Sequence, residues 1–457
     1  MTVRTLFIAN RGEIAVRIIK AAKALGIRTV QAVSAADRDM LAARLADATV
    51  EIGPAHAAKS YLNKDAIVAA AVNSGADAVH PGYGFLAENA EFAEKVEAAG
   101  LIFVGPRPET IRAMGDKAVA RDIAAKAGVP AIPGSHGRVE TFEAALRAAD
   151  AVGYPMMIKA AAGGGGRGIR VAHTPAELQT LIPQASAEAL AAFGDGGLYL
   201  ERFVKRARHI EVQILGDGER AIHLYERECS LQRRRQKVWE EAPAACLAPS
   251  RREALCASAV RLAQSVGYRG AGTLEYLYEE QTGEFFFIEM NTRIQVEHPI
   301  TEMITGIDIV QTMLRIAGGE PLPYRHSDIA IRGHAIEVRI NAEDPAKGFM
   351  PSPGRVSALS TPEGGDVRFD TMLYEGYVVP PFYDSLLGKL IVWGDDRPAA
   401  LDRLRGALGD LSIGGVATTR GLHLALLDVI AIRNGEVHTR WLEEWLALDS
   451  AAPVKAA

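Results

Sequence analysis

Residues 288–297 alternate between hydrophobic and polar side chains, directly after three phenylalanines. An extended backbone would project five polar side chains to one face: Glu289, Asn291, Arg293, Gln295 and Glu297. The opposite face is apolar. We therefore predict a core strand whose polar face lines a site. The alternative is an edge strand with a solvated face, although such faces rarely combine Asn, Gln and Arg after so apolar a start.

A second strand is predicted just upstream, at residues 272–278, where Thr273, Glu275 and Leu277 share one face. The polar residues 279–284 join the two stretches and are typical of a hairpin loop. The hairpin would place the two polar faces side by side.

This pairing brings Glu275 within reach of Glu289 and Asn291. Two carboxylates about 4 Å apart repel by roughly 1–4 kcal/mol, and a cation removes that repulsion. Because all the donors are oxygen atoms, the expected ion is Mg²⁺ or Mn²⁺ carrying phosphate oxygens, and not Zn²⁺. The hairpin thus predicts a nucleoside triphosphate site.

The N-terminal part of the chain alternates short apolar runs with helical patterns, which predicts a parallel sheet with crossover helices. The predicted strands are residues 6–9, 29–33, 48–52, 76–79 and 101–104, with a helix over residues 12–25. The first turn lacks Gly-x-Gly-x-x-Gly, so dinucleotide binding is not supported. Residues 80–85 follow a strand at the carboxyl end, where such sheets bind ligands, although a tight turn is the simpler interpretation.

Residues 131–204 are predicted to form a separate small module. Within it, an apolar strand ends at Lys159 and leads into the glycine-rich residues 163–168. Glycines let backbone N–H groups close over phosphates in a loop that opens and shuts, whereas a plain linker is the alternative. Lys117 begins a predicted helix and is either a phosphate contact or a surface lysine.

Two further stretches carry charge into the same region. Residues 209–215 alternate as a half-buried strand should, and residues 334–340 do likewise. Residues 232–237 are strongly basic, but four flanking glutamates balance them: Glu226, Glu228, Glu240 and Glu241. An anion site shared with the acidic hairpin is therefore favoured over nucleic-acid binding.

Composition narrows the function classes. The chain has 457 residues and a net charge of −5, so no general basic surface for nucleic acid is expected. Its three cysteines are too few for a disulfide framework or a zinc site and fit a reducing, cytoplasmic location. No apolar stretch reaches membrane-spanning length, so we expect no membrane association.

Two motifs, residues 78–89 (AVHPGYGFLAEN) and residues 290–298 (MNTRIQVEH), carry a resemblance that extends from Phe7 to about Leu448. Together with residues 226–234 they make the chain similar to the biotin carboxylase component of biotin-dependent carboxylases, in the ATP-grasp superfamily. The resemblance implies an α/β fold in three parts. These are a Rossmann-like N-terminal domain (1–114), an ATP-grasp domain (115–330) with the mobile lid 131–204, and a mixed α/β C-terminal domain (331–448), before a flexible tail (449–457).

The resemblance also implies the reaction. ATP and bicarbonate would react to form carboxyphosphate, with two Mg²⁺ or Mn²⁺ ions bound to the nucleotide. The carboxyl group would then pass to biotin on a separate carrier protein. We expect a carboxyltransferase as a further partner, a homodimer, and an acyl-CoA (acetyl-CoA or propionyl-CoA) as final acceptor. A pyruvate-type acceptor, another ATP-grasp ligase and an inactive scaffold are the alternatives.

Site residues are carried over motif by motif as implications of the resemblance. The nucleotide would be held by Lys117, Lys159, Gly164, Gly165, Gly166, Glu201, Val204, His209, Gln232, Glu275, Leu277 and Glu289. Metal ligands would be Glu275, Glu289 and Asn291. Bicarbonate would lie against Lys237, Arg293, Gln295, Val296 and the general base Glu297. Biotin would lie near Tyr83 and the catalytic Arg339, with Lys237, Arg293 and Glu297 completing the catalytic set.

Three positions depart from the family pattern. Ala161 and Ala162 stand where many relatives carry Ser-Gly, which predicts reduced lid mobility. Arg235 stands where other side chains are common, so nearby nucleotide contacts are left open. None of these positions belongs to the implied metal or bicarbonate groups.

Overall fold

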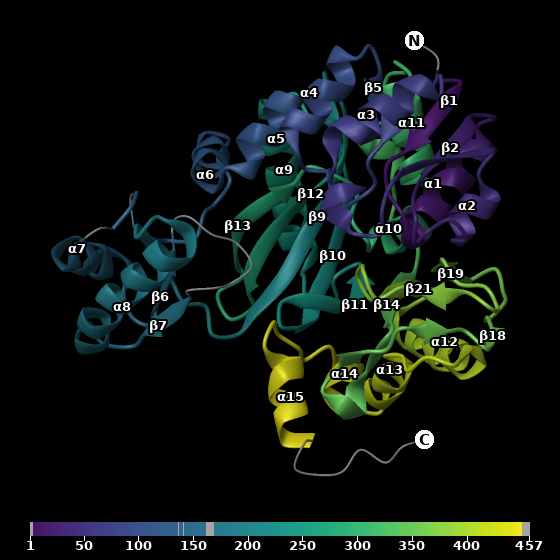
Figure 1. The fold of residues 1–457 in the computed structure, drawn as a ribbon. Coiled ribbons are helices and arrows are strands. Elements are labelled where there is room, and N and C mark those ends of the chain that lie inside the picture. The colour runs from purple at the N-terminus through teal and green to yellow at the C-terminus, as the bar shows by residue number, and fades with distance from the viewer. Residues whose placement is uncertain (1–2, 136, 140, 161–168, 450–457) are drawn as a thin grey trace.

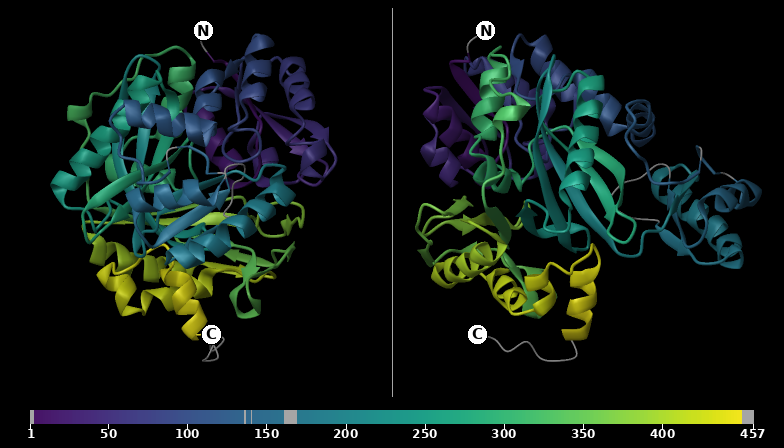
Figure 2. Two further views of the ribbon diagram at one scale, coloured as in Figure 1. Left: turned by 90° about the vertical axis from the view of Figure 1, so that its left-hand side faces the viewer. Right: turned by 180° about the vertical axis from the view of Figure 1, so that it is seen from behind.

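A computed structural model describes residues 3–135, 137–139, 141–160 and 169–449. Figure 1 shows an N-terminal α/β part, a long central sheet, a small module that projects away from it, and a C-terminal part below. The view from behind in Figure 2 shows the same projecting module, so its separation is not an effect of one viewpoint. The predicted α/β architecture is therefore confirmed.

The N-terminal sheet is parallel throughout, as predicted, with strand order β3-β2-β1-β4-β5. Its strands are β1 (Thr5–Ile8), β2 (Arg28–Ser34), β3 (Ala48–Gly53), β4 (Ala78–His80) and β5 (Ile102–Phe103). Its helices are α1 (Gly12–Ala24), α2 (Leu41–Leu45), α3 (Lys64–Asn73), α4 (Ala90–Ala98) and α5 (Pro108–Gly115). Phe7 and Ile8, adjacent on β1, enter two different apolar clusters because successive strand residues face opposite sides of the sheet.

The projecting module has its own core beneath a three-stranded antiparallel sheet, ordered β7-β6-β8. Its elements are α7 (Phe142–Val152), β6 (Met156–Ala160), β7 (Arg170–Ala172), α8 (Pro175–Phe193) and β8 (Leu198–Arg202), after α6 (Lys117–Lys126). Ile158, Leu178 and Leu200 are fully buried between sheet and helices. Residues 161–168, which include Ala161, Ala162 and the predicted glycines Gly164, Gly165 and Gly166, lie outside the described residues.

The central sheet has eight strands in the order β13-β12-β9-β10-β11-β14-β21-β19. They are β9 (Ala207–Asp217), β10 (Ala221–Arg233), β11 (Gln236–Ala242), β12 (Arg269–Glu279), β13 (Glu284–Asn291), β14 (His334–Asn341), β19 (Val367–Thr371) and β21 (Leu386–Gly394). The helices that follow these strands along the chain include α9 (Pro249–Ser265), α10 (His298–Thr305) and α11 (Ile309–Ala317). One continuous sheet thus joins the predicted ATP-grasp and C-terminal regions through the β11–β14 pairing.

The structure corrects two strand predictions. The strand predicted to continue beyond Asn291 ends there as β13, and the chain turns into α10 at His298, where Pro299 occupies the first helical turn. Arg293, Gln295 and Glu297 therefore lie between the strand and the helix, and proline suits the helix start that follows them. The β9 segment is buried on both faces and not half-buried, because it is a central strand of the sheet.

The C-terminal part covers the far end of the sheet with small β pairs and helices. The helices are α12 (Arg397–Asp410), α13 (Arg420–Leu427), α14 (Ile430–Asn434) and α15 (Trp441–Asp449). The short strands are β15 (Glu343–Asp344), β16 (Met350–Pro351), β17 (Gly354–Arg355), β18 (Ala358–Ser360), β20 (Val378–Val379) and β22 (Ser412–Gly414). The 3₁₀ turns are η1 (Ala57–Lys59) in the N-terminal part, η2 (His326–Asp328) before β14 and η3 (Pro345–Lys347) after β15. Among the described helices, none has the length and apolarity needed to cross a bilayer.

The core packed against β12 should contribute strongly to the stability of the central sheet. Leu274 on β12 is fully buried, and truncating a buried leucine to alanine costs about 3 kcal/mol. We expect Leu274→Ala to lower the urea midpoint accordingly, whereas Leu62→Ala, at a 42% exposed leucine, should leave it nearly unchanged. Equal midpoints for the two variants would contradict this packing.

Candidate functional site

The predicted acidic hairpin is present at one edge of the sheet. Glu275 on β12 pairs directly with Glu289 on β13, and Asn291 Nδ2 donates to Glu275 Oε1 at 2.9 Å. Lys117 Nζ, at the start of α6, lies 3.8 Å from Glu289 Oε2. Burial and the neighbouring Glu275 charge raise the pKa of Glu289, with Lys117 opposing them. Glu275, Glu289 and Asn291 therefore form an oxygen donor set whose repulsion a divalent cation would relieve, so the residues fit Mg²⁺.

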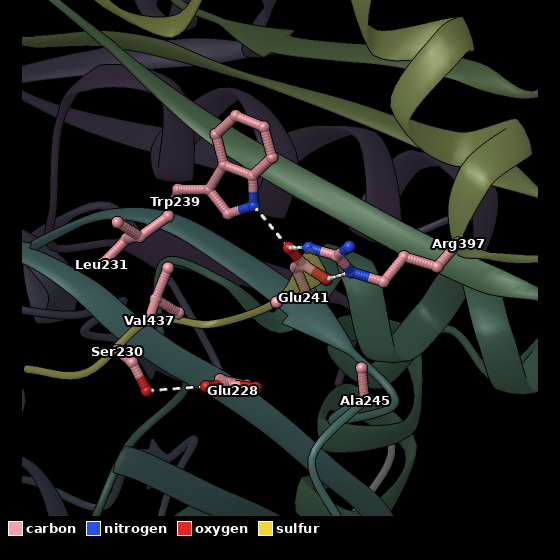
Figure 3. Close-up of a pocket in the computed structure, with 9 residues that line it drawn as sticks. Glu228, Ser230, Leu231, Trp239, Glu241, Ala245, Arg397 and Val437 are labelled. Carbon is pink, nitrogen blue, oxygen red and sulfur yellow. Dashed lines mark hydrogen bonds and ion pairs between the residues drawn. The ribbon is translucent and has the colours of Figure 1, made fainter. Parts of the chain in front are cut away.

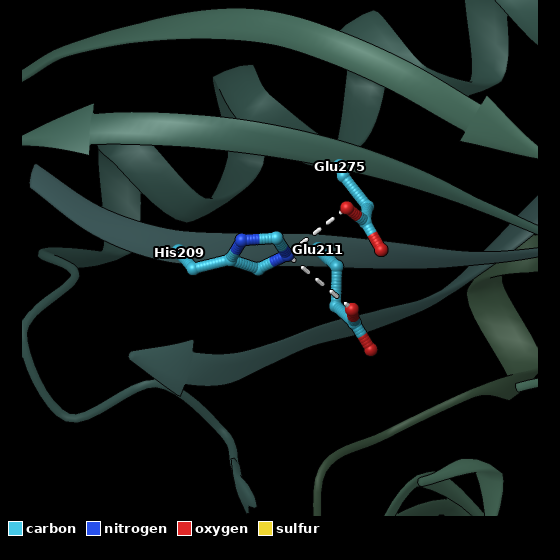
Figure 4. A group of neighbouring side chains, drawn as sticks. All are labelled: His209, Glu211 and Glu275. Carbon is cyan, nitrogen blue, oxygen red and sulfur yellow. Dashed lines mark ion pairs between the residues drawn. The ribbon is translucent and has the colours of Figure 1, made fainter. Parts of the chain in front are cut away.

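Glu211 lies beside the hairpin in the middle of β9, next to His209 (Figure 4). His209 Nε2 lies 3.3 Å from Glu275 Oε2 and 3.8 Å from Glu211 Oε2. Glu211 is already neutralised by two cations, because Arg227 Nε donates to it at 2.6 Å and Lys237 Nζ at 2.5 Å. Glu211 therefore already has two cations of the chain as partners, whereas the hairpin carboxylates fit a divalent ion.

The sequence reasoning did not single out Glu211 or Arg227 as site residues. Both are fully buried, and β9 pairs with β12 so that Glu211 lies opposite Glu275. The two-residue spacing of His209 and Glu211 on a predicted strand was the available signal, because residues at that spacing share a face.

Lys237 is the central cation of the site. In addition to Glu211, its Nζ donates to Glu297 Oε1 at 2.6 Å, Glu275 Oε1 at 3.1 Å and Gln295 Oε1 at 3.5 Å. Burial alone would lower the pKa of Lys237, but the charges of Glu211, Glu275 and Glu297 raise it well above the ordinary value. Lys237 is therefore a permanent positive charge at the position where the sequence predicted an anion contact.

The rest of the predicted basic run does not join Lys237. Residues 232–237 contain the turn between β10 and β11, where Arg234 and Arg235 have positive φ angles of 49° and 65°. The Arg233 guanidinium lies over the Phe349 ring, 3.7 Å from its centroid, and the Arg234 backbone N–H donates to Glu443. Lys237 therefore contacts the acidic hairpin, whereas the turn directs Arg233 and Arg234 toward the C-terminal part, and the shared anion site stays a prediction.

The predicted general base Glu297 is fully buried between two cations. Lys237 contacts one of its oxygens, and Arg339 Nη2 donates to the other at 2.9 Å. Burial alone would raise the pKa of Glu297, but Lys237, Arg339 and Arg227 together hold it well below its usual range. Glu297 is therefore ionised, and its basicity depends on how strongly these cations stay committed to it.

Arg293 and its neighbours are fixed from several sides. Arg293 Nε donates to Glu88 Oε2 at 2.8 Å, and its Nη2 donates to Asn291 Oδ1 at 3.0 Å. Gln295 Nε2 donates to Glu275 Oε1 at 3.1 Å, and the Val296 carbonyl accepts from Lys389 Nζ. Glu88 lies within the motif that carried the resemblance but received no role.

Tyr83 lies at the junction of the N-terminal and C-terminal parts. Its hydroxyl donates to Glu13, and its carbonyl accepts from Asn10 Nδ2 at 2.7 Å. Glu13 Oε2 also lies 3.4 Å from Nζ of the fully buried Lys389. The buried pair Glu13–Lys389, absent from the sequence predictions, thus connects Tyr83 with the loop that contains Val296.

The remaining predicted nucleotide residues are divided between the projecting module and the central sheet. Lys159 on β6 and Arg121 on α6 both contact Glu201 on β8. Gln232 Nε2 donates to the Cys229 carbonyl at 2.8 Å. Two apolar members complete this set, namely the buried Val204 and the half-buried Leu277, which pairs with His209 across β12 and β9.

A small cavity elsewhere on the sheet is not a competing substrate site. Figure 3 shows Trp239, Glu241 and Arg397 joined at its edge, where Glu241 accepts from both neighbours. Its volume is about 10 Å³, which is room for one water molecule. The cavity is part of the packing between β10, β11 and the C-terminal helices.

Nearly the whole chain matches known proteins. Family models match residues 2–111 (Biotin carboxylase, N-terminal domain), 116–325 (Carbamoyl-phosphate synthase L chain, ATP binding domain) and 337–444 (Biotin carboxylase C-terminal domain). A biotin carboxylase of Pseudomonas aeruginosa is 55% identical over 446 residues, covering 97% of this chain and 99% of that protein. The chain belongs to the biotin carboxylase family. It is accordingly an ATP-dependent ligase, as the sequence predicted.

Two further members of the biotin carboxylase family differ in acceptor. A pyruvate carboxylase subunit of Methanothermobacter thermautotrophicus is 48% identical, covering 96% of this chain and 89% of that protein. The biotin carboxylase domain dimer of Hydrogenobacter thermophilus 2-oxoglutarate carboxylase, solved with MgADP, ADP and bicarbonate, is 45% identical with a TM-score of 0.91 and full coverage of both chains. The family, the fold and the cofactor class are thereby confirmed, whereas the roles of individual residues and the domain boundaries stay predictions.

The raised pKa of Glu289 leads to a test of the metal site. When folding raises the pKa of a carboxyl group, the free energy of unfolding falls as the pH rises from the unfolded-state pKa to the folded-state pKa. At higher pH the protein stays destabilised by the same amount. We therefore expect Glu289→Gln to raise the melting temperature of metal-free protein at about pH 8 and to change it less at about pH 5. Mg²⁺ should stabilise the wild type and not the variant.

Glu284→Gln is the matched control, because Glu284 lies on the same strand but pairs with Arg202 at the exposed end. It should keep the Mg²⁺ response. An unchanged Mg²⁺ response in Glu289→Gln would remove Glu289 from the metal site.

Proposed function

We propose that this chain carboxylates biotin on a separate biotin carboxyl carrier protein, using ATP and bicarbonate, as the first half-reaction of an acyl-CoA (acetyl-CoA or propionyl-CoA) carboxylase. The observation that carries the proposal is the adjacency of the acidic hairpin and the Lys237–Glu297–Arg339 cluster on one sheet. Support for the half-reaction comes from relatives that match along nearly the whole chain.

The nucleotide would lie between the central sheet and the projecting module, against Lys117, Lys159, Glu201, Val204, His209, Gln232, Leu277 and the glycines Gly164, Gly165 and Gly166. Glu275, Glu289 and Asn291 would hold two Mg²⁺ ions (or Mn²⁺), which neutralise phosphate charge during phosphoryl transfer. Lys159 is suited to a phosphate contact, because its side chain is 32% exposed and a partly exposed ion pair such as Lys159–Glu201 is weak. A phosphate group could therefore replace Glu201 as its partner.

Bicarbonate would bind against Lys237, Arg293, Gln295 and the Val296 backbone. Arg293 offers a planar fork to a planar anion, and Glu88 fixes the orientation of that fork. Lys237 and Arg339 hold the pKa of Glu297 low, and a bicarbonate anion bound between them would offset part of their positive charge. The resulting rise in basicity would let Glu297 accept the bicarbonate proton as the carbonate oxygen attacks the γ-phosphate.

Arg339 would stabilise the negative charge that develops on the biotin ureido oxygen, with Tyr83 beside the ring. Its guanidinium is held between Glu240, at 2.7 Å from Nε, and Glu297, at 2.9 Å from Nη2. A cation fixed before the reaction stabilises a developing anion without reorganisation.

The partners follow from this chemistry. We propose a biotinylated carrier, a carboxyltransferase, a homodimeric state and a cytoplasmic location. A pyruvate-type carboxylase is the second candidate, supported by the 48% identity to the pyruvate carboxylase relative. Identifying the carrier and transferase that copurify with the chain distinguishes the two acceptors.

The proposed function predicts that ADP release requires Mg²⁺ and bicarbonate and is accelerated by free biotin, with carboxybiotin as product. Glu289→Gln should abolish turnover by removing a metal ligand, whereas Glu284→Gln should retain it. ADP release without bicarbonate but with another carboxylate substrate would indicate a different ATP-grasp ligase. Nucleotide binding without turnover would indicate a scaffold.

Arg339→Ala should separate the two parts of the reaction. We expect carboxybiotin formation to fall by about 100-fold, because the charge that stabilises the biotin anion is lost. Bicarbonate-dependent ATP cleavage should fall by less than about tenfold, because Lys237 still neutralises Glu297. Equal losses in both assays would contradict the role given to Arg339.

A further inference from the structure

Two buried carboxylates lie behind Arg339: Glu240, which holds its guanidinium, and Glu337, which has no part in the mechanism above. Glu240 on β11 lies directly opposite Glu337 on the neighbouring antiparallel strand β14. Directly opposed residues project to the same face, with Cβ atoms about 4.5–5.5 Å apart. Both side chains are fully buried, so water does not screen their mutual repulsion.

Their hydrogen bonds are incomplete. Glu240 Oε1 accepts from Arg339 Nε, but Glu240 Oε2 and both oxygens of Glu337 accept no hydrogen bond from any described residue. An ionised carboxylate can only accept, so two ionised groups at this position would leave three buried oxygens without a donor. One proton makes either carboxyl group a donor to the other.

The surrounding cations are shared with acceptors outside the pair. Arg339 divides its guanidinium between Glu240 and Glu297, and Lys389 Nζ donates to the Val296 carbonyl and faces Glu13. The charged and titratable groups that act on the pair are Lys237 on β11, Arg339 on β14, Lys389 on β21 and Glu297 before α10, with the Cys229 thiol nearby on β10. Among the described residues, a second negative charge on the pair therefore has no cation of its own.

The titration of both groups agrees with this geometry. Burial raises the pKa of Glu240 to about 7, with Arg339 opposing the shift and Glu297 adding to it. Burial also raises the pKa of Glu337 well above its usual value, opposed by Lys389 and reinforced by Glu240.

We propose that Glu240 and Glu337 share a single proton and that this proton, through Arg339, sets the charge available where biotin is carboxylated. Glu337 is then a positioning residue, because it reaches the reacting groups only through Glu240 and Arg339. Loss of the proton adds a negative charge behind the guanidinium and weakens its hold on a developing anion. The inference rests on the proposed role of Arg339 in the biotin reaction.

The test compares the pH dependence of free-biotin carboxylation with that of bicarbonate-dependent ATP cleavage. In the wild type, carboxylation should fall on the alkaline side by up to about tenfold per pH unit, as for the loss of one proton, with ATP cleavage falling less. In Glu337→Gln, whose amide donates to Glu240 as the protonated acid does, the alkaline fall should disappear while the rate at neutral pH stays within about threefold. Persistence of the alkaline fall in the variant would overturn the proposal.

Two further variants make the comparison specific. Glu240→Gln removes the carboxylate that orients Arg339, so carboxylation should fall at every pH while the Michaelis constant for ATP is unchanged. Glu228→Gln is the matched control, because Glu228 is also a buried glutamate of this sheet but pairs with Arg208 and Ser230. Its pH profile should match the wild type, and an equal flattening there would overturn the assignment to Glu337.

Infrared difference spectroscopy provides a readout that does not depend on turnover. Wild type minus Glu337→Gln should contain the carbonyl stretch of one protonated carboxylic acid at neutral pH, lost on alkalinisation. Absence of this band would overturn the shared proton. If the band is present but the wild type carboxylates no biotin at any pH, the proposed function fails and the proton assignment stands.

Discussion

The site depends on charge compensation among buried side chains of the central sheet and of Glu297, which precedes α10. Glu211, Glu275 and Glu297 all contact the single ammonium of Lys237. Burying any of these charges alone would be costly, because desolvation exceeds what one partner returns. Together they form a network in which each carboxylate has a cation, and the network persists only while the strands that carry it stay in register.

The same network sets the proton affinity of Glu297, the proposed general base. Glu297 is held ionised by Lys237 and Arg339, so its proton affinity is lowest when no anion competes for those cations. Under the proposed function, a substrate anion would enter the same positive field and withdraw part of it. The base strength of Glu297 would then depend on whether the site is occupied.

Connections between domains converge on the same place. Lys389 reaches Glu13 in the N-terminal part and the Val296 carbonyl in the central part, while its own strand β21 belongs to the C-terminal end of the sheet. A fully buried lysine in such a junction ties the relative position of the three parts to the geometry around Val296. The projecting module has a separate core.

The sequence by itself determined the parallel N-terminal sheet and the acidic hairpin, because the alternation that marks a strand is a local property. The ATP-grasp resemblance came from the motifs at residues 78–89, 226–234 and 290–298. Tertiary structure decided that β13 ends at Asn291 although the alternating pattern continues to Glu297. It also decided which glutamates meet which cations. Glu211, Glu240 and Glu337 acquire their surroundings from strands that are distant in sequence, and pairing register across a sheet is set by the packing of the whole sheet.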